Sequence, residues 1–339
     1  MKHLPLGLLT AAALTLAAPV PAEQNYTDAT GRSVTIPDDP GRVFAAGPPA
    51  AVLLYVLKPE AMVGWVRAPR EGDLPFLREE VRALPALGRL TGRGDTVNLE
   101  VLLGATPDLI VDFGTVNDTY IDLANRVQDQ TGLPYVLVDG SLAAMSASIR
   151  QMADVLGVAE RGEELAAYTE AQLARLDAVL ATVPANERPR VYLARGPEGL
   201  ETPARGSINA EIIERVGAGN VAVAETRGVT TVSVEQVQAW APDVIVTIDR
   251  DFAARVGSMP EWQGIPAVAN GRVYLAPSAP FGFIDSPPSV NRLAGLIWLA
   301  HRLYPEAAQG DLATEIGDFH ELFYGIRPDD AALAALLGG

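Results

Sequence analysis

Two stretches of this chain are closely similar: TVNLEVLLGATPDLIV, from Thr96 to Val111, and TVSVEQVQAWAPDVIV, from Thr231 to Val246. They agree at seven of sixteen positions without a gap, at a constant offset of 135 residues. Each has a glutamate at its fifth position, Glu100 and Glu235, and each ends in Pro-Asp followed by an apolar run. The similarity indicates that one structural unit occurs twice.

The neighbouring segments repeat in the same order. An apolar run after an arginine precedes each stretch, at residues 42–46 and 190–194, and a glycine leads into a third apolar run at residues 132–138 and 271–275. The runs at 109–111 and 244–246 are continuous rather than alternating, which is typical of parallel strands buried on both faces. The sequence therefore predicts an α/β fold of two lobes with mainly parallel sheets.

The segment between the two halves has a helical pattern. Residues 160–184 carry leucines and a tyrosine mostly on one stripe, and Pro184 ends the pattern. A helix of about 22 residues measures roughly 33 Å, enough to cross between lobes. We expect an N-terminal lobe at 23–159, a single connecting helix at 160–184, a C-terminal lobe at 185–339, and a cleft between the lobes.

Composition argues against nucleic acid and anionic membranes as partners, and the N-terminal residues predict export. Of 339 residues, 48% are hydrophobic, the mean hydropathy is +0.15 and the formal charge is −16. Acidic chains without basic blocks are poor partners for polyanions. Residues 1–22 form a short positive start, an apolar run and a small-residue end, the pattern of a cleavable signal peptide. Because the chain has no cysteine, it has no lipid-attachment site or disulfide, and a soluble periplasmic protein is expected.

Several ordered segments resemble the periplasmic solute-binding proteins of ABC importers for iron–siderophore, haem and cobalamin, a family with two lobes and one backbone helix. Besides the two repeated stretches, the segments that carry the resemblance are residues 27–37 with Arg42-Val43, Val63-Gly64-Trp65, residues 217–221 and residues 262–274. Residues 286–296 are similar to a subgroup usually labelled iron-complex binding proteins.

The repeated glutamates have a local and a functional interpretation. Asn98 and Ser233 suit helix N-caps, Ser233 with Gln236 matches a capping box, and a first-turn glutamate is favoured by the helix dipole. The resemblance implies that Glu100 and Glu235 dock onto arginines of a permease dimer in the inner membrane, one from each lobe. The binding protein itself is expected to be a monomer.

The ligand is expected in the cleft, at the loops that follow the carboxyl ends of strands. Arginines suit anions with several oxygens, and aromatic rings suit a planar chelate. The candidate ligand-binding residues are Trp65, Arg67, Tyr120, Arg195, Arg205, Arg250, Phe281, Phe283 and Arg292. For Arg292, lying along its own helix is an equally good interpretation, and for Phe281 and Phe283 so is packing between lobes.

The function expected first is capture of an iron(III)–siderophore or related metal complex for an ABC importer. A molybdate or tungstate receptor of the same fold is the alternative, and haem or cobalamin binding is the second alternative. A protein cofactor, a bare metal site and catalysis are not expected, because after signal removal only His301 and His320 remain and no catalytic motif is present. A secreted enzyme and a signalling sensor are the rivals from other classes.

Overall fold

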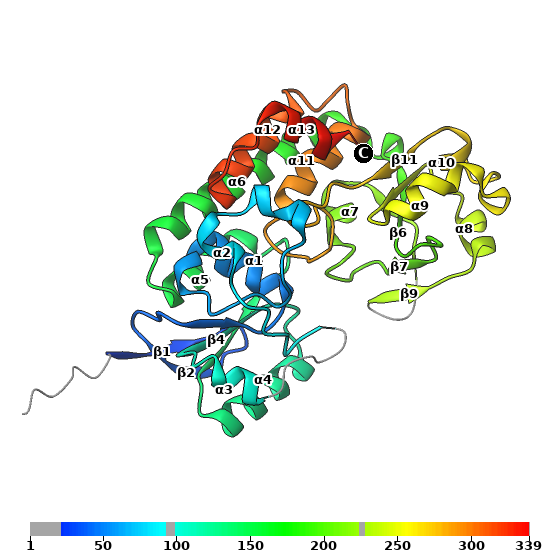
Figure 1. Cartoon of the computed structure of the whole chain (residues 1–339). Helices are drawn as coiled ribbons and strands as arrows, with labels where there is room; N and C mark the ends of the chain where they lie inside the picture. The colour runs from blue at the N-terminus through cyan, green and yellow to red at the C-terminus, as the bar shows by residue number, and fades with distance from the viewer. Residues whose placement is uncertain (1–21, 93–98, 224–227, 339) are drawn as a thin grey trace, which may run out of the picture.

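The computed structural model describes residues 22–92, 99–223 and 228–338. Figure 1 shows two α/β lobes side by side, with a layer of helices along one edge of both. The expected fold class is confirmed: both lobes have parallel sheets, and one long helix runs between them. Among the described helices, none has the length and apolar character needed to cross a membrane.

The N-terminal lobe is built on a parallel sheet of order β3-β4-β5, from strands Val43–Ala45, Leu109–Gly114 and Tyr135–Asp139. An antiparallel hairpin, β1 (Glu23–Thr27) and β2 (Ser33–Pro37), precedes it. The other elements of this part of the chain are α1 (Pro48–Leu57), η1 (Pro59–Ala61), η2 (Glu71–Phe76), α2 (Glu79–Arg82), α3 (Leu99–Gly104), α4 (Asp118–Thr131) and α5 (Met145–Val155).

The C-terminal lobe contains a four-stranded parallel sheet of order β11-β10-β6-β8. Its strands are β6 (Arg190–Ala194), β8 (Gly219–Asn220), β10 (Val244–Thr247) and β11 (Val273–Leu275), and a small antiparallel pair is formed by β7 (Glu201–Pro203) and β9 (Val229–Thr231). The flanking elements are η3 (Ala185–Glu187), α7 (Glu211–Arg215), α8 (Val234–Trp240), α9 (Arg250–Arg255), η4 (Val256–Ser258), η5 (Pro260–Trp262) and α10 (Pro266–Ala269).

The long helix expected between the lobes is α6, Ala159–Thr182. The last helices of the chain gather beside it at the top of the molecule (Figure 1), with α11 and α12 in contact with α6 and α13 on α12. They are α11 (Arg292–Leu303), α12 (Leu312–Phe319), the π-helical turn η6 (His320–Tyr324) and α13 (Asp330–Leu337). The division of the chain into lobes at 23–159 and 185–339 stays a proposal.

The internal repeat is visible in the strand register. In the first sheet Val43 lies opposite Leu109, and Ile110 lies opposite Tyr135. In the second sheet Val191 lies opposite Val244, and Ile245 lies opposite Val273; Val244 and Ile245 follow Leu109 and Ile110 at the offset of 135 residues. The two halves therefore have the same strand pairing as well as similar sequences.

The repeated aspartates join neighbouring strands. The Asp108 carboxylate accepts hydrogen bonds from the backbone N–H groups of Gly41 and Arg42, at 3.0 and 3.1 Å. The Asp243 carboxylate accepts one from Arg190 N at 2.8 Å. Each aspartate thus holds the start of the neighbouring strand. The proline before each aspartate ends the preceding helix.

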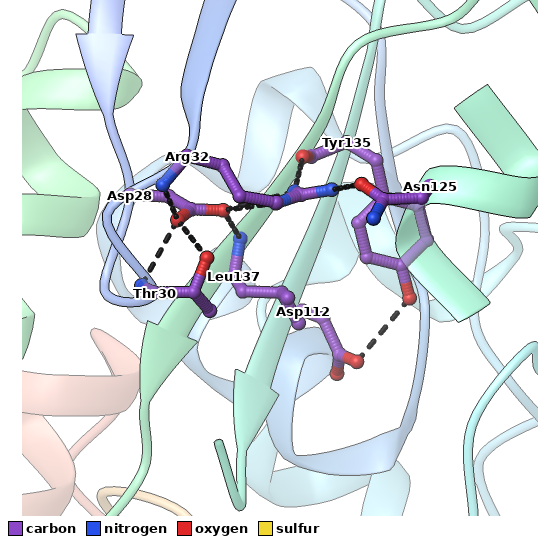
Figure 2. A network of polar contacts seen from close by, with 7 residues as sticks. All are labelled: Asp28, Thr30, Arg32, Asp112, Asn125, Tyr135 and Leu137. Carbon is purple, nitrogen blue, oxygen red and sulfur yellow. Dashed lines mark hydrogen bonds and ion pairs between the residues drawn. The ribbon is translucent and has the colours of Figure 1, made fainter. Parts of the chain in front are cut away.

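A polar network attaches the N-terminal hairpin to the first lobe (Figure 2). Asp28 pairs with Arg32 at 2.9 Å and accepts from Thr30 N at 2.9 Å, while Arg32 donates to Tyr135 O and to Asn125 Oδ1. Burial raises the pKa of Asp28, but the hydrogen bonds from Thr30 and Arg32 outweigh this effect and leave the pKa lowered. The segment that begins TDATGR, part of the family resemblance, therefore has a structural role.

Candidate ligand-binding cleft

A cavity of about 730 Å³ lies between the two lobes. Its N-terminal wall comes from the start of α1 and from residues 65–77, and its C-terminal wall comes from residues 248–251 and 275–287. The helix α13 also contributes to the lining, through Ala332, Ala335 and Leu336. Small-molecule sites commonly occupy such spaces at domain interfaces, with volumes of roughly 300–1,000 Å³.

Aromatic side chains form part of the wall. Trp65 and Phe281 face each other with ring centroids 6.1 Å apart, one from each lobe, and Phe76 lies nearby in the lining. The Trp65 indole donates from Nε1 to Val81 O at 2.8 Å, and its ring packs on Tyr55 at 5.7 Å. These contacts hold the indole in place, so the wall is formed before a ligand arrives.

Three arginines and three aspartates line the cavity, but their charges are not equally available. Arg70 pairs with Asp73 at 2.8 Å and also donates to Ser278 O of the other wall at 3.1 Å. The Asp249 carboxylate caps α9 by accepting from Phe252 N at 2.9 Å. Asp251 lies in the first turn of the same helix.

The remaining two arginines are available to a ligand. Arg67 from the N-terminal wall and Arg250 from the C-terminal wall are exposed, and within the described residues neither guanidinium makes a hydrogen bond or ion pair. A guanidinium offers several N–H donors in one plane, a geometry that matches carboxylate and other oxyanion groups. The cleft thus presents one unpaired cation from each lobe.

The structure brings four of the nine expected ligand residues together. Trp65, Arg67, Arg250 and Phe281 line the cavity. Tyr120 does not, because it is half-buried against the apolar cluster beneath α4. Arg205 lies away from the cavity and donates to Asn220 O at 2.6 Å.

Three further candidates lie outside the cavity lining. Phe283 is 0% exposed and belongs to the core. Arg195 pairs with the buried Asp285 carboxylate at 2.8 Å. Arg292 is also 0% exposed, and its burial lowers the pKa of its guanidinium to about 10. These three side chains are held by protein groups and do not reach the cavity.

Arg292 instead joins the lobes. Its guanidinium donates to Ile208 O at 3.1 Å and to Glu211 Oε2 at 3.2 Å, both in the C-terminal lobe, and to Gly140 O in the N-terminal lobe. Glu211 Oε2 also accepts from Leu142 N at 2.8 Å. This small set of bonds ties the two lobes together.

Sequence reasoning missed most of the apolar lining. Phe76, Pro277 and the alanines of α13 carry no polar group that marks a site, and α13 lies about 80 residues beyond Arg250 in the chain. Arg70, which follows Trp65 and Arg67 in the chain, was recognisable as a cleft residue, but its pairing with Asp73 was not. No group of three or more histidine, aspartate or glutamate side chains placed to hold a metal is found in the described part of the chain.

The two repeated glutamates lie on the outside of the molecule. Glu100 and Glu235 are exposed in the first turns of α3 and α8. The Ser233 side chain caps α8 by accepting from Gln236 N at 3.3 Å, and a hydrogen bond from Ser233 lowers the pKa of Glu235. The expected cap Asn98 lies outside the described residues.

Two α/β lobes, a single long helix and a cavity at their junction define a solute-binding protein. Comparison with known proteins agrees: residues 78–280 match the family model described as periplasmic binding protein. Because the match covers more than half of the chain, the chain belongs to the periplasmic binding protein family, which confirms the resemblance. Proteins of this kind are extracytoplasmic, bind small ligands for ABC transporter permeases and are not enzymes.

Molybdate is the ligand printed in the names of two similar proteins. The chain is 29% identical over 335 residues to the molybdate-binding protein MolA of Haemophilus influenzae, covering 92% of this chain and 94% of the relative. A solute-binding protein from Sulfurospirillum deleyianum superposes with a TM-score of 0.84 at 27% identity, over 93% and 99% of the two chains. The molybdate-bound MolA structure gives 0.75 at 25% identity, over 90% and 99%.

Proposed function

We propose that this chain captures an anionic metal complex, of the kind that ferric iron forms with a siderophore, and delivers it to an ABC importer. The observation that supports this ligand class is the pair Arg67 and Arg250, one unpaired cation on each wall of an aromatic-lined cavity. An anionic chelate placed between them would contact both lobes and lie against Trp65 and Phe281.

The size of the cavity favours a chelate over a small ion. A water molecule takes about 30 Å³ of liquid volume, so an ion with four oxygens takes about 120 Å³. The cavity of about 730 Å³ is several times larger. A siderophore complex, with a metal surrounded by a chelator of drug-like size, matches the space more closely.

Molybdate is the second candidate, favoured by the two comparisons with MolA. A tetrahedral oxyanion would occupy one corner of the cavity, held by one or both free arginines. A direct titration separates the candidates: purified protein is titrated with ferric siderophores, haem, cobalamin, molybdate and tungstate, and tryptophan fluorescence is followed. Tight binding of molybdate without any ferric complex would overturn the first proposal.

The arginine pair is tested by substitution. We expect Arg67→Ala and Arg250→Ala each to weaken binding of the anionic ligand about 10- to 100-fold, since hydrogen bonds to charged groups contribute about 1.5–3 kcal/mol. Arg205→Ala, which removes an exposed arginine away from the cavity, is the matched control. Equal affinities in all three variants would remove the support for this site.

Delivery is proposed to use Glu100 and Glu235, whose equivalent helices place one carboxylate on each lobe. Two such contacts on a permease dimer would orient the complex and speed association. The protein is proposed to act as a periplasmic monomer after removal of residues 1–22. Glu100→Gln and Glu235→Gln should reduce uptake but leave ligand affinity unchanged, whereas Glu306→Gln, on the segment between α11 and α12, should change neither.

A further inference from the structure

The C-terminal helix α13 is apolar over almost its whole length, yet little of it is buried. Residues 331–337 are all alanine or leucine, and in this helix, which the structure describes in full, Leu333 is the residue that lies in the core. A helix that is apolar all round is normally buried. Part of α13 lines the ligand cavity instead and brings no polar side chain to it, through Ala332, Ala335 and Leu336.

The protein holds α13 in this position at both ends. At the start of the helix the Asp329 carboxylate accepts a hydrogen bond from Ala332 N at 2.8 Å. At its end Arg302, from α11, donates to Leu337 O at 2.9 Å. The core contact of Leu333 lies between these two bonds. The apolar residues are thus fixed on the cavity wall and are not the loose end of a chain.

The end of α13 lies close to an apolar part of the C-terminal wall. The guanidinium of Arg302 that binds Leu337 O also lies over the ring of Tyr274, 5.9 Å from its centroid. Tyr274 belongs to β11, and the residues that follow it, 275–277, are a leucine, an alanine and a proline in the cavity lining. One arginine therefore connects α13 with this apolar segment.

The chain that leads into α13 lies close to an apolar part of the N-terminal wall. Arg78 donates from Nε to Tyr324 O at 3.3 Å, in η6, the element that precedes α13. The residues just before Arg78, 75–77, are a proline, a phenylalanine and a leucine in the cavity lining. The ring of Phe76 also packs on His320 of η6, with centroids 5.6 Å apart. The C-terminal segment thus contacts apolar parts of both walls.

The charged side chains of the lining come from other segments. They belong to residues 67–73 of the N-terminal wall and 249–251 of the C-terminal wall, and are Arg67, Arg70, Asp73, Asp249, Arg250 and Asp251. The segments 75–77 and 275–277 and the three residues of α13 contribute none. We call these last three groups the apolar region of the cavity. The lining therefore combines a charged region with an apolar region that has a helix of its own.

We propose that the ligand is amphiphilic, an anionic metal chelate that carries a hydrocarbon chain, and that this chain lies against α13. The inference rests on the proposed function, which puts the charge of the chelate at Arg67 and Arg250. A chelate without an apolar group leaves the cavity side of α13 in contact with water. A chain buried there strengthens binding about fourfold for each methylene removed from water.

The first test compares two synthetic ferric hydroxamate complexes. They share one anionic head and differ only in the acyl group on the same nitrogen, which is acetyl in one and octanoyl in the other. Titration followed by tryptophan fluorescence gives both dissociation constants. We expect the octanoyl complex to bind at least about tenfold more tightly, the effect of burying about two methylenes.

Two matched variants locate the chain. Ala335→Asn puts a polar amide on the apolar region and should reduce the gain from the octanoyl group to about threefold or less, since less hydrocarbon is then removed from water. Ala334→Asn makes the same change at the next position of the helix, which is exposed but does not line the cavity, and should keep the full gain. Circular dichroism shows that both variants are folded.

The outcomes separate this inference from the proposed function. Equal affinities of the unmodified protein for the two complexes would overturn the amphiphilic ligand and leave capture of a chelate intact. Binding of neither complex, nor of any other ferric siderophore, would overturn the proposed function and this inference with it. A gain that is the same in Ala335→Asn as in the unmodified protein would overturn the role of α13.

A photoreactive chelate provides an independent test. The same head is given an octanoyl chain that ends in a diazirine, and the complex is irradiated on the protein and digested. We expect mass spectrometry to find the label within residues 328–338, and an excess of the plain octanoyl complex to prevent labelling. Labels confined to residues 67–73 and 249–251 would contradict the proposal.

Discussion

At the scale of single residues, the arginines near the cleft differ in whether a carboxylate of the protein already pairs with them. Arg67 and Arg250 face the cleft without partners among the described residues, whereas Arg195 and Arg292 are held by acids, Asp285 and Glu211. An arginine that already has a carboxylate close by gains little from an anionic ligand. The electrostatics of the cleft are therefore set by which arginines the protein leaves unpaired.

His320 provides a prediction at this scale. It is fully buried among aromatic rings, and no hydrogen-bond partner of either ring nitrogen is found in the described residues. Burial lowers its pKa to about 4, against about 6.5 for a free histidine. Between these values the unfolded chain binds a proton that the folded chain does not, so His320 makes the fold less stable as pH falls, by at most about 1.4 kcal/mol per pH unit.

The variant His320→Phe isolates the contribution of His320 to the pH dependence of stability. The variant is needed because Asp112 contributes to the same pH dependence with the opposite sign. Burial raises the pKa of Asp112 to about 6, so its share of the stability is present at low pH and is lost as pH rises through 6. We expect the unfolding free energy of His320→Phe to fall less steeply than that of the unmodified chain between pH 6.5 and 4.5. Urea denaturation at several pH values measures it, and identical slopes would contradict the prediction.

At the scale of elements, the equivalent helices α3 and α8 end with the same backbone conformation. Thr106 and Ala241, equivalent positions before the repeated prolines, have φ values of 45° and 44°. Arg42 holds the end of α3 through Ala105 O and Thr106 O, and Arg190 donates to Ala241 O at 3.2 Å. The left-handed conformation of Thr106 and Ala241, neither of which is glycine, is thus held by an arginine at the start of the neighbouring strand.

Glycine at these positions should stabilise the protein. The left-handed conformation costs an L-residue roughly 1–2 kcal/mol, and glycine avoids this cost. Part of that gain is offset because glycine has more conformational freedom in the unfolded chain. We expect Thr106→Gly and Ala241→Gly each to raise the unfolding free energy by about 0.5–1 kcal/mol. Ala239→Gly, within helix α8, should lower it by a similar amount. Thermal denaturation followed by circular dichroism measures all three, and the prediction fails if the cap variants lose stability.

The C-terminal helix α13 is predicted to limit ligand size. Ala332 and Ala335 are small residues on the cavity wall, while Leu333 anchors the helix in the core. Ala335→Trp should project a large ring into the cavity and weaken binding of a ferric siderophore at least tenfold. Ala334→Trp, an adjacent position that does not line the cavity, is the control. Titration of both variants measures the effect, and equal affinities would contradict this role for α13.

At the scale of the whole molecule, the two lobes are joined by more than α6. Arg292 bonds to both lobes, Glu211 accepts from Leu142 N, and the Ser289 hydroxyl donates to Pro49 O at 2.8 Å. The helices α11 and α12 pack on α6 along the edge of the molecule (Figure 1), and α13 packs on α12. Because buried polar bonds must be broken for the lobes to separate, we expect only small changes in the cleft on ligand binding.

Arg292→Met tests this junction. The substitution leaves the carboxylate of Glu211 and three backbone carbonyls without their charged partner, and breaking a buried ion pair typically costs about 3–5 kcal/mol. We therefore expect a loss of stability in that range, measured by guanidinium denaturation. Arg327→Met removes exposed pairs with Asp318 and Glu321 and should cost less than about 1 kcal/mol. Equal losses in the two variants would contradict the special role of Arg292.

The sequence by itself determined the duplication, the parallel strands and the long helix, because these depend on local patterns: continuous apolar runs, a helical stripe and the Pro-Asp punctuation. The tertiary structure alone decided which arginines and aromatic rings face the ligand. Arg195 and its partner Asp285 are 90 residues apart, and Arg292 and Gly140 are 152 residues apart. Pairings between residues so far apart leave no periodic pattern in the sequence. The fold could therefore be predicted from TVNLEVLLGATPDLIV and its copy, whereas the residues that line the cleft are set by the packing of the two lobes in the tertiary structure.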